Sequence, residues 1–194
     1  MTHQDESALV ERARTDANAF GVLYDRYVGR IYAYVMRQTG DVATAQDITA
    51  ATFEKALRHI RRFQWRESGF APWLYRIAGN EIAQHFRKRR FTVAWEEGDE
   101  AALPGRMAGG NSARSPEATL LASEQASALE CALRQLGAAD REILTLRYLE
   151  GLPTDDVAAL LGCSRDNVYV RLHRALARLR RQLERLHETE VNRS

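Results

Sequence analysis

Cysteine is scarce in this sequence, and no long run of apolar residues occurs. Cys131 and Cys163 are the only two cysteines among 194 residues, and their spacing matches no set of metal ligands. Isolated thiols are typical of proteins in a reducing compartment, where disulfides seldom persist. The segment Met1 to Glu6 is polar and acidic, unlike a signal peptide, and no apolar stretch reaches membrane-spanning length. We therefore expect a cytoplasmic protein with no metal site, no disulfide and no membrane insertion.

The motifs of the common enzyme classes are also missing. The sequence contains no glycine-rich phosphate-binding loop, no paired metal-ligand motif and no nucleophile elbow, and its five histidines are scattered. We therefore expect no catalytic residue and no cofactor, and a function that depends on binding. The formal net charge is only +2, but arginines cluster locally, which favours a nucleic acid as the binding partner.

Apolar residues in the first half of the chain recur with the period of an α-helix, which predicts a bundle of three helices preceded by a short one near residues 7–14. The ends of the three helices are marked by residues that typically begin or end helices: Asp16, Gly40, Asp41 and Pro72. The second helix is predicted to bury a face that includes Ile48, Phe53 and Leu57. A loop, residues 63–71, separates it from the third helix, which ends in the basic run Arg87 to Arg90.

After Phe91 the composition changes to acidic residues, glycine and proline without helical periodicity, and helical patterns resume at Pro116. We predict two domains, residues 1–92 and 116–188, joined by a flexible linker, residues 93–115, and followed by a disordered tail, residues 189–194. No segment alternates with the period of two that is typical of a β-strand. The predicted fold class is therefore all-α, with two small helical domains.

The segment 153–185 predicts a short helix, a tight turn and a long helix, which together form a helix-turn-helix. Gly162 is suited to the turn, and Ser164 to the start of the second helix. The first turns of such a helix lie in the major groove of duplex DNA, where base edges are accessible. The side chains predicted to point outward there are Arg165, Asn167, Tyr169, Val170, Arg171, His173 and Arg174. For the arginines further along this helix, contact with phosphates and simple exposure to solvent are equally open.

Two segments resemble one known family. The run from Leu136 to Gly162 resembles region 4 of the bacterial RNA polymerase sigma factors, and the run from Trp73 to Asn80, with the basic residues that follow, resembles region 2. Because nothing sizeable lies between the two domains, the chain resembles the extracytoplasmic-function (ECF) group within the sigma-70 family. The alternative is a helix-turn-helix regulator of transcription that is not a polymerase subunit.

The resemblance implies that the chain binds core RNA polymerase and directs promoter-specific initiation. Region 4 would bind the minus-35 element as duplex, and region 2 would bind the minus-10 element after melting. Unpaired bases need stacking surfaces, and their phosphates need cations. The residues that match the family's positions for the minus-10 element are Phe63, Gln64, Trp65, Arg66, Ser68, Phe70, Arg76, Asn80, Gln84, Arg87 and Lys88. For Phe63 and Phe70, a place in the core is equally open.

The resemblance also implies protein partners. Core RNA polymerase would be bound through the clamp helices of its β′ subunit and through its β flap, and an anti-sigma factor commonly inhibits such proteins. The matching polymerase-binding residues are Asp47, Ile48 and Phe53. Gln46, Ala50 and Ala51 stand where the family usually has acidic or glutamine side chains, so the polar part of this contact is expected to be weaker or shifted. For the acidic cluster 96–100, a place in the nucleic-acid channel of polymerase and a role as a solvated spacer are equally open.

Overall fold

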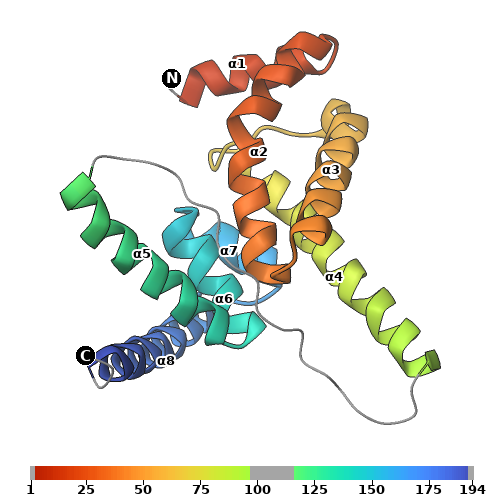
Figure 1. Cartoon of the computed structure of the whole chain (residues 1–194). Coiled ribbons are helices and arrows are strands. Elements are labelled where there is room, and N and C mark those ends of the chain that lie inside the picture. Colours follow the sequence, from red (N-terminus) through yellow and green to blue (C-terminus); the bar gives the residue numbers. More distant parts are fainter. Residues whose placement is uncertain (1–2, 97–115, 192–194) are drawn as a thin grey trace. The chain divides into compact units, whose positions relative to one another are not determined.

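The computed structural model describes residues 3–96 and 116–191. Every element in these residues is a helix, and the described parts of the chain contain no β-strand (Figure 1). The chain divides into two compact units, Met1–Gly105 and Arg106–Ser194. The prediction of an all-α fold with two small helical domains is therefore confirmed, while most of the predicted linker lies outside the described residues. None of the described helices is both long enough and apolar enough to cross a membrane.

The first unit is a bundle of helices around α2 (Ala17–Thr39). This helix packs against α1 (His3–Ala13), α3 (Val42–His59) and α4 (Ala71–Glu96), and a short 3-10 turn, η1 (Ile60–Arg62), follows α3. Helices α3 and α4 also pack against each other, so that the three long helices enclose one core.

Side chains that the sequence predicts as caps hold the ends of α2 and α3. Asp16 accepts a hydrogen bond from the backbone N–H of Asn18 at 2.8 Å, and Asp41 accepts one from that of Thr44 at 2.8 Å. Hydrogen bonding to Thr44 lowers the pKa of Asp41, because it stabilises the carboxylate. Gly40 ends α2 in the left-handed conformation, with φ at 71°, and donates its N–H to the last turn of the helix. The predicted ends of these helices are therefore confirmed.

The predicted apolar stripes meet in the interior of the first unit. Leu23 and Ile31 of α2 and Leu74 of α4 are among its fully buried side chains. The rings of Tyr34 and Tyr75 meet edge to face, with their centroids 5.3 Å apart. Burial of each large apolar side chain stabilises the folded state by about 1.5–3 kcal/mol, so these contacts hold α2 and α4 together.

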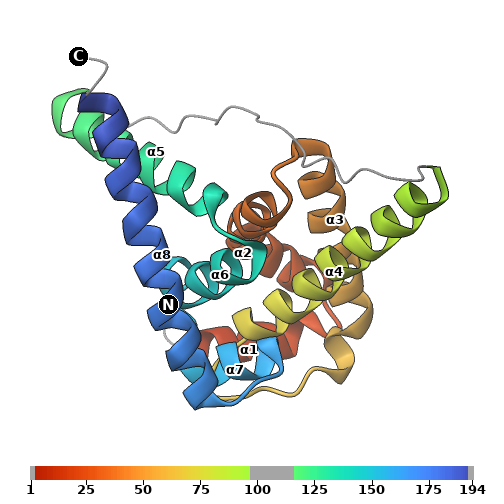
Figure 2. The same ribbon diagram turned by 90° about the horizontal axis from the view of Figure 1, so that it is seen from below.

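Helix α8 (Arg165–Val191) organises the second unit. It packs against α5 (Pro116–Gln135), α6 (Ala138–Leu144) and α7 (Thr154–Leu161), as Figure 2 shows, and a π-helical turn, η2 (Thr145–Leu149), follows α6. The buried apolar residues of these elements and their connections form the core: Ala132, Leu133, Leu136, Ile143, Leu144, Leu146, Leu152, Val157, Ala158, Val168, Leu172 and Ala175.

Two helices extend a few residues beyond the predicted ends of the domains. Helix α4 continues to Glu96, beyond the predicted start of the linker at residue 93, and α8 continues to Val191, inside the predicted tail. Neither extension contains glycine or proline, so nothing interrupts the backbone hydrogen bonds that propagate a helix. A change to polar composition is a weaker helix stop than a residue that disfavours helical geometry.

Alanine at Gly40 and alanine at Gly29 should change the stability of the first unit in opposite directions. An added Cβ would meet no atom within 4 Å at either site, so packing plays no part. Gly40→Ala places an L side chain in left-handed geometry, which should lower the free energy of unfolding by about 1–2 kcal/mol. Gly29 lies inside α2, and Gly29→Ala should raise it by about 0.5–1 kcal/mol.

Urea unfolding followed by tryptophan fluorescence measures this effect in the first unit, because that unit contains all three tryptophans, Trp65, Trp73 and Trp95. A similar loss of stability in both variants would contradict the assignment of these effects to backbone geometry.

Candidate nucleic-acid interface

Helix α7, a tight turn and the start of α8 form the predicted helix-turn-helix. Gly162 has a φ of 62° and donates its backbone N–H to the carbonyl of Ala158, and the N–H of Cys163 donates to the same carbonyl at 3.1 Å. Ser164 precedes α8, and its Oγ accepts a hydrogen bond from the backbone N–H of Asn167 at 3.2 Å. The turn and the cap therefore have the geometry that the sequence predicts.

The first half of α8 has a buried face and an exposed face. Val168, Leu172 and Ala175 are buried, as is Val157 of the adjacent α7. Arg171 is half-buried. The other residues predicted to contact duplex DNA are exposed: Arg165, Asn167, Tyr169, Val170, His173 and Arg174. The structure thus presents outward the side chains that the sequence analysis assigns to the outer face.

Tyr169 and Arg165 hold each other on this outer face. Nη2 of Arg165 donates a hydrogen bond to the hydroxyl of Tyr169 at 3.4 Å, and the guanidinium lies 5.9 Å from the centroid of the tyrosine ring. Arg165 also lies 3.5 Å from a carboxylate oxygen of Asp155 in α7. Hydrogen bonds with Arg165 and with Thr154 lower the pKa of Tyr169. The phenol therefore lies beside the guanidinium of Arg165 in the first turns of α8.

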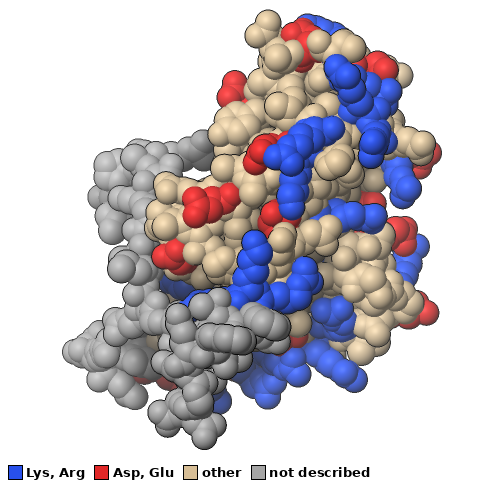
Figure 3. Space-filling model, turned by 90° about the vertical axis from the view of Figure 1, so that its right-hand side faces the viewer, with Lys and Arg blue, Asp and Glu red and all other residues tan. Residues whose placement is uncertain are grey.

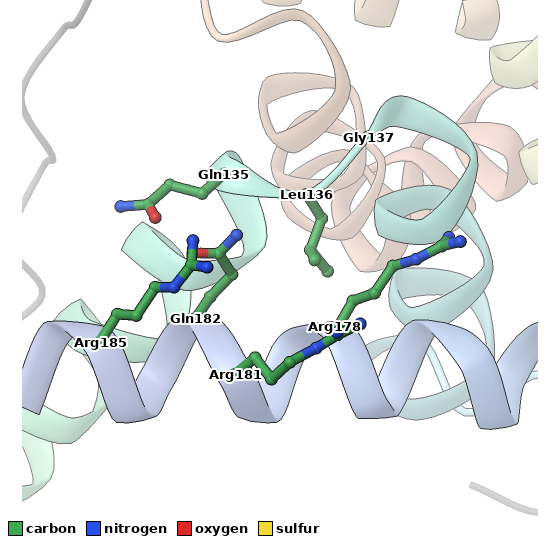
Figure 4. A pocket seen from close by; sticks show the side chains of 7 residues that line it. All are labelled: Gln135, Leu136, Gly137, Arg178, Arg181, Gln182 and Arg185. Atoms are coloured by element: carbon green, nitrogen blue, oxygen red, sulfur yellow. The ribbon is translucent and has the colours of Figure 1, made fainter.

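An open cavity of about 180 Å³ lies beside the second half of α8, near the junction of α5 and α6 (Figure 4). The residues that line it are Gln135, Leu136, Gly137, Arg178, Arg181, Gln182 and Arg185. Arg178 pairs with Asp140 of α6, and Arg180 of the same helix pairs with Glu184 at 2.9 Å. Carboxylates of the same unit thus offset part of the positive charge on this half of α8.

The loop between η1 and α4 has buried ends and an exposed middle. Phe63 is 7% exposed and Phe70 is 0% exposed, and their rings pack edge to face with centroids 5.4 Å apart. Trp73 of α4 lies against both rings, at 4.9 and 5.2 Å. Of the two alternatives left open for the phenylalanines, the structure has the core placement, so their rings are not available to stack on bases. The predicted DNA-binding residues between them are exposed or half-buried: Gln64, Trp65, Arg66 and Ser68.

The residues of α4 that are predicted to bind DNA follow one another at helical spacing. Arg76, Asn80 and Gln84 are four residues apart, and Arg87 and Lys88 lie one turn further along, so the five share one face. Gln84 is half-buried and the others are exposed. Figure 3 shows groups of Lys and Arg side chains at the molecular surface, with fewer Asp and Glu between them. A basic helical face of this kind suits the phosphate backbone of a nucleic acid.

Of the three residues predicted to bind polymerase, only Asp47 is exposed. Ile48 is 6% exposed and Phe53 is 4% exposed, and the ring of Phe53 packs edge to face on Tyr24 with centroids 4.8 Å apart. Leu57, which the sequence analysis assigns to the buried face, is instead 50% exposed one turn after Phe53. A helical pattern identifies an apolar face, but the neighbouring helices decide how much of that face they cover.

Two exposed side chains on η2 were not predicted as functional. Tyr148 is 55% exposed and Leu149 is 40% exposed, and the guanidinium of Arg147 lies 5.8 Å from the centroid of the Tyr148 ring. π-helical turns frequently occur at functional sites. The available signal in the sequence was the spacing of Leu146, Tyr148 and Leu149, which cannot all lie on one face of a helix.

Within residues 3–96 and 116–191, no group of three or more His, Cys, Asp or Glu side chains is arranged to hold a metal ion. Cys131 and Cys163 are half-buried free thiols. Nη1 of Arg171 lies 3.9 Å from Sγ of Cys163, so this arginine touches the turn that precedes its own helix.

Two segments of the chain match family models. Residues 23–92 match sigma-70 region 2, and residues 126–179 match sigma-70 region 4. The first segment contains the loop and the basic face of α4, and the second contains the helix-turn-helix.

Curated proteins are similar to this chain over most of its length. The ECF RNA polymerase sigma factor BldN of Streptomyces coelicolor is 38% identical over 177 residues, which cover 90% of this chain but 64% of BldN, so the chain spans slightly less than two thirds of that relative. The RNA polymerase sigma-H factor of Pseudomonas aeruginosa is 33% identical over 191 residues, which cover 96% of this chain and 97% of that protein.

Two solved structures have a similar fold. The sigma factor RpoE of Bartonella quintana, in complex with the anti-sigma factor NepR, has a TM-score of 0.65 at 23% identity and covers 85% of this chain and 96% of its own. CnrH, in complex with the cytosolic domain of CnrY, has a TM-score of 0.62 at 24% identity and covers 92% of this chain and 97% of its own. At such identities the likeness shows the fold alone.

Replacement of Phe70 and of Gln64 should separate the structural residues of the loop from the exposed ones. Phe70→Ala removes a fully buried ring and should lower the free energy of unfolding of the first unit by about 3–5 kcal/mol. Gln64→Ala removes an exposed side chain and should change it by less than about 0.5 kcal/mol. Urea unfolding followed by tryptophan fluorescence compares the two variants, and equal stabilities would refute the core placement of Phe70.

Proposed function

The chain belongs to the sigma-70 family of RNA polymerase sigma factors, in the extracytoplasmic-function group, and we propose that it directs core RNA polymerase to promoters by binding two DNA elements with its two units. The second unit binds the minus-35 element, and the first unit binds the melted minus-10 element. The observation that supports this most is that each unit presents polar and basic side chains outward from the segment that matches its family model. The protein acts by binding, with no catalysis of its own, in the cytoplasm where polymerase works.

Binding of the minus-35 element depends on the first turns of α8 in the major groove. Asn167, Tyr169 and Val170 are placed to meet base edges, where amide, hydroxyl and apolar groups distinguish base pairs. Arg171 and Arg174 lie one turn further along and bind phosphates, which position the helix but do not select a sequence.

Binding of the minus-10 element depends on the loop and on α4. A base that leaves the duplex stack costs about a few kcal/mol, which contacts to the unpaired base must offset. Gln64 and Arg66 supply exposed polar groups and Trp65 supplies a half-buried ring. Arg76 and Lys88 mark the two ends of the face on α4 that follows the phosphates of the unpaired strand. Phe63 and Phe70 support the loop from the core.

Binding of core polymerase depends on the exposed side of α3. Asp47 supplies a charge, and Leu57 supplies a half-exposed apolar side chain one turn after Phe53, whose ring packs on Tyr24. Aromatic and apolar side chains at the centre of an interface contribute most to its affinity. We assign this surface to the clamp helices of the β′ subunit, and the exposed side chains of η2 to the β flap.

An anti-sigma factor is a further expected partner. RpoE of Bartonella quintana was solved with its anti-sigma factor NepR, which supports a similar partner for this chain. Such a protein would prevent transcription by covering the surfaces that bind core polymerase.

Transcription reconstituted from purified components tests the function. Core polymerase with this protein should initiate from a subset of a randomised promoter library, and core polymerase alone should not. The selected promoters should share an upstream and a downstream element. Sequence-specific binding of duplex DNA by the free protein, without any effect on initiation by core polymerase, would instead support a regulator that is not a polymerase subunit.

Arg174→Ala should weaken binding of the holoenzyme to minus-35 duplex. Loss of one phosphate contact should reduce the slope of log affinity against log salt concentration by about one. Fluorescence anisotropy of a labelled duplex across a salt series measures this slope. Arg180→Ala is the matched control, because Arg180 lies on the same helix but is paired with Glu184. An unchanged slope for Arg174→Ala, or an equal change in both variants, would contradict the proposed docking of α8.

Leu57→Ala should weaken binding to core polymerase by about five- to tenfold, because it removes an apolar side chain from the proposed interface. A titration of labelled sigma protein with core polymerase measures the affinity. As a control for affinity, the Arg174→Ala protein should bind core polymerase like the unmodified chain. As a control for stability, the Leu57→Ala protein should unfold at the same urea concentration as the unmodified chain. Unchanged affinity for core polymerase in Leu57→Ala would show that this side of α3 is not the interface.

A further inference from the structure

We propose that Arg14, at the end of α1, is a positioning residue for the loop that contacts the minus-10 element. The proposal rests on the proposed function of that loop. Arg14 precedes residues 23–92, the segment that matches sigma-70 region 2. The positioning role of Arg14 is therefore inferred from its contacts in this structure and not from the match to that family model.

Arg14 and Arg61 join the end of α1 to the start of the loop by two hydrogen bonds. Nη2 of Arg14 donates to the backbone carbonyl of Phe63 at 2.7 Å, and Nε of Arg61 donates to the backbone carbonyl of Arg14 at 3.1 Å. Each guanidinium thus binds the main chain of the other segment, across 49 and 47 positions of sequence. Nη1 of Arg14 is also held, by Glu11 at 3.2 Å, which fixes the direction of its guanidinium.

These bonds complete the fixation of Phe63. Its N–H donates to the carbonyl of Ile60 at 3.1 Å, and its ring is buried against Phe70 and Trp73. The hydrogen bond from Arg14 holds the backbone carbonyl of Phe63. This carbonyl belongs to the peptide bond between Phe63 and the exposed residue Gln64. The direction in which the exposed segment leaves the core is therefore set by Arg14.

The other end of the loop is fixed without α1. Phe70 is fully buried, and Gly69 has a φ of 80° with its N–H donated to the carbonyl of Arg66 at 2.9 Å. With both ends fixed, the side chains between them need less ordering when a base binds, which favours binding.

Helix α1 is itself held firmly on α2, so Arg14 projects from a fixed support. Glu6 accepts a hydrogen bond from the hydroxyl of Tyr27 and pairs with Arg26 at 3.2 Å. Burial of Tyr27, together with the carboxylate of Glu6, raises the pKa of the phenol. The hydroxyl therefore stays protonated and donates its hydrogen bond to Glu6. Leu9 and Val10 of α1 are buried.

The test compares Arg14→Ala with Arg12→Ala in the reconstituted holoenzyme. Both changes remove one arginine from the same end of α1, but Arg12 is 70% exposed and lies 3.7 Å from Asp16 instead of touching the loop. The measured quantity is the ratio of affinities for a single-stranded oligonucleotide with the preferred minus-10 sequence and for one with that sequence scrambled. Arg14→Ala should reduce this ratio by about tenfold, the effect expected when one charge-assisted hydrogen bond is lost. Arg12→Ala should leave it unchanged.

Arg61→Ala and Arg62→Ala form a second matched pair. Both residues lie in η1, but the bond to the carbonyl of Arg14 comes from Arg61. Arg61→Ala should reduce the discrimination ratio in the same direction as Arg14→Ala, and Arg62→Ala should not. Tryptophan fluorescence would reveal whether Arg14→Ala unfolds the first unit. In that case, the comparison of Arg61→Ala with Arg62→Ala tests whether the contact between α1 and the loop positions the loop.

Affinities for core polymerase and for minus-35 duplex separate a positioning role from a general structural one. Both should be unchanged in Arg14→Ala and in Arg61→Ala. A discrimination ratio equal to that of the unmodified chain, or a parallel loss of affinity for core polymerase, would overturn the proposal. If the unmodified holoenzyme itself did not discriminate between the oligonucleotides, the proposed function of the loop would fail instead.

Discussion

Burial of two phenylalanine rings is the interaction on which the proposed DNA-binding surface of the first unit depends. Phe63 and Phe70 lie at the two ends of a short loop, and both pack against Trp73 of α4. Both rings are buried, while Gln64, Arg66 and Glu67 between them are exposed. The same contacts join the loop to α4. Apolar packing thus determines the position of groups that have no part in the core.

The second unit follows the same rule with different elements. Val168 and Leu172 of α8 are buried in the core that α7 shares, and this fixes the rotation of α8 about its own axis. The helix then presents Tyr169 and Arg174 outward. Gly162 sets the angle between the two helices, because its left-handed conformation ends α7 within one residue. A stable core and an outward-facing row of polar side chains on α8 are therefore consequences of one packing arrangement.

The apolar residues at the surface have a different meaning from those in the core. Leu57 and Tyr148 are each about half exposed, in different units, and no described helix covers them. A single exposed apolar side chain does not lower the stability of the folded protein. When it lies among other exposed apolar residues, it favours association with another protein. Under the proposed function, such residues lie at the surfaces that core polymerase covers.

The sequence by itself determined the helices, their caps, the helix-turn-helix and the family, because these depend on local periodicity and on short motifs such as Asp41 before α3 and Gly162 after α7. It also assigned the outer face of α8 correctly, since one buried stripe defines the opposite side of a helix. Only the tertiary structure decided that Phe63 and Phe70 are buried and that Leu57 is exposed, because burial depends on neighbouring elements. The bond between Arg14 and Phe63 joins residues 49 positions apart, and no local pattern encodes a contact that exists only after the bundle has formed.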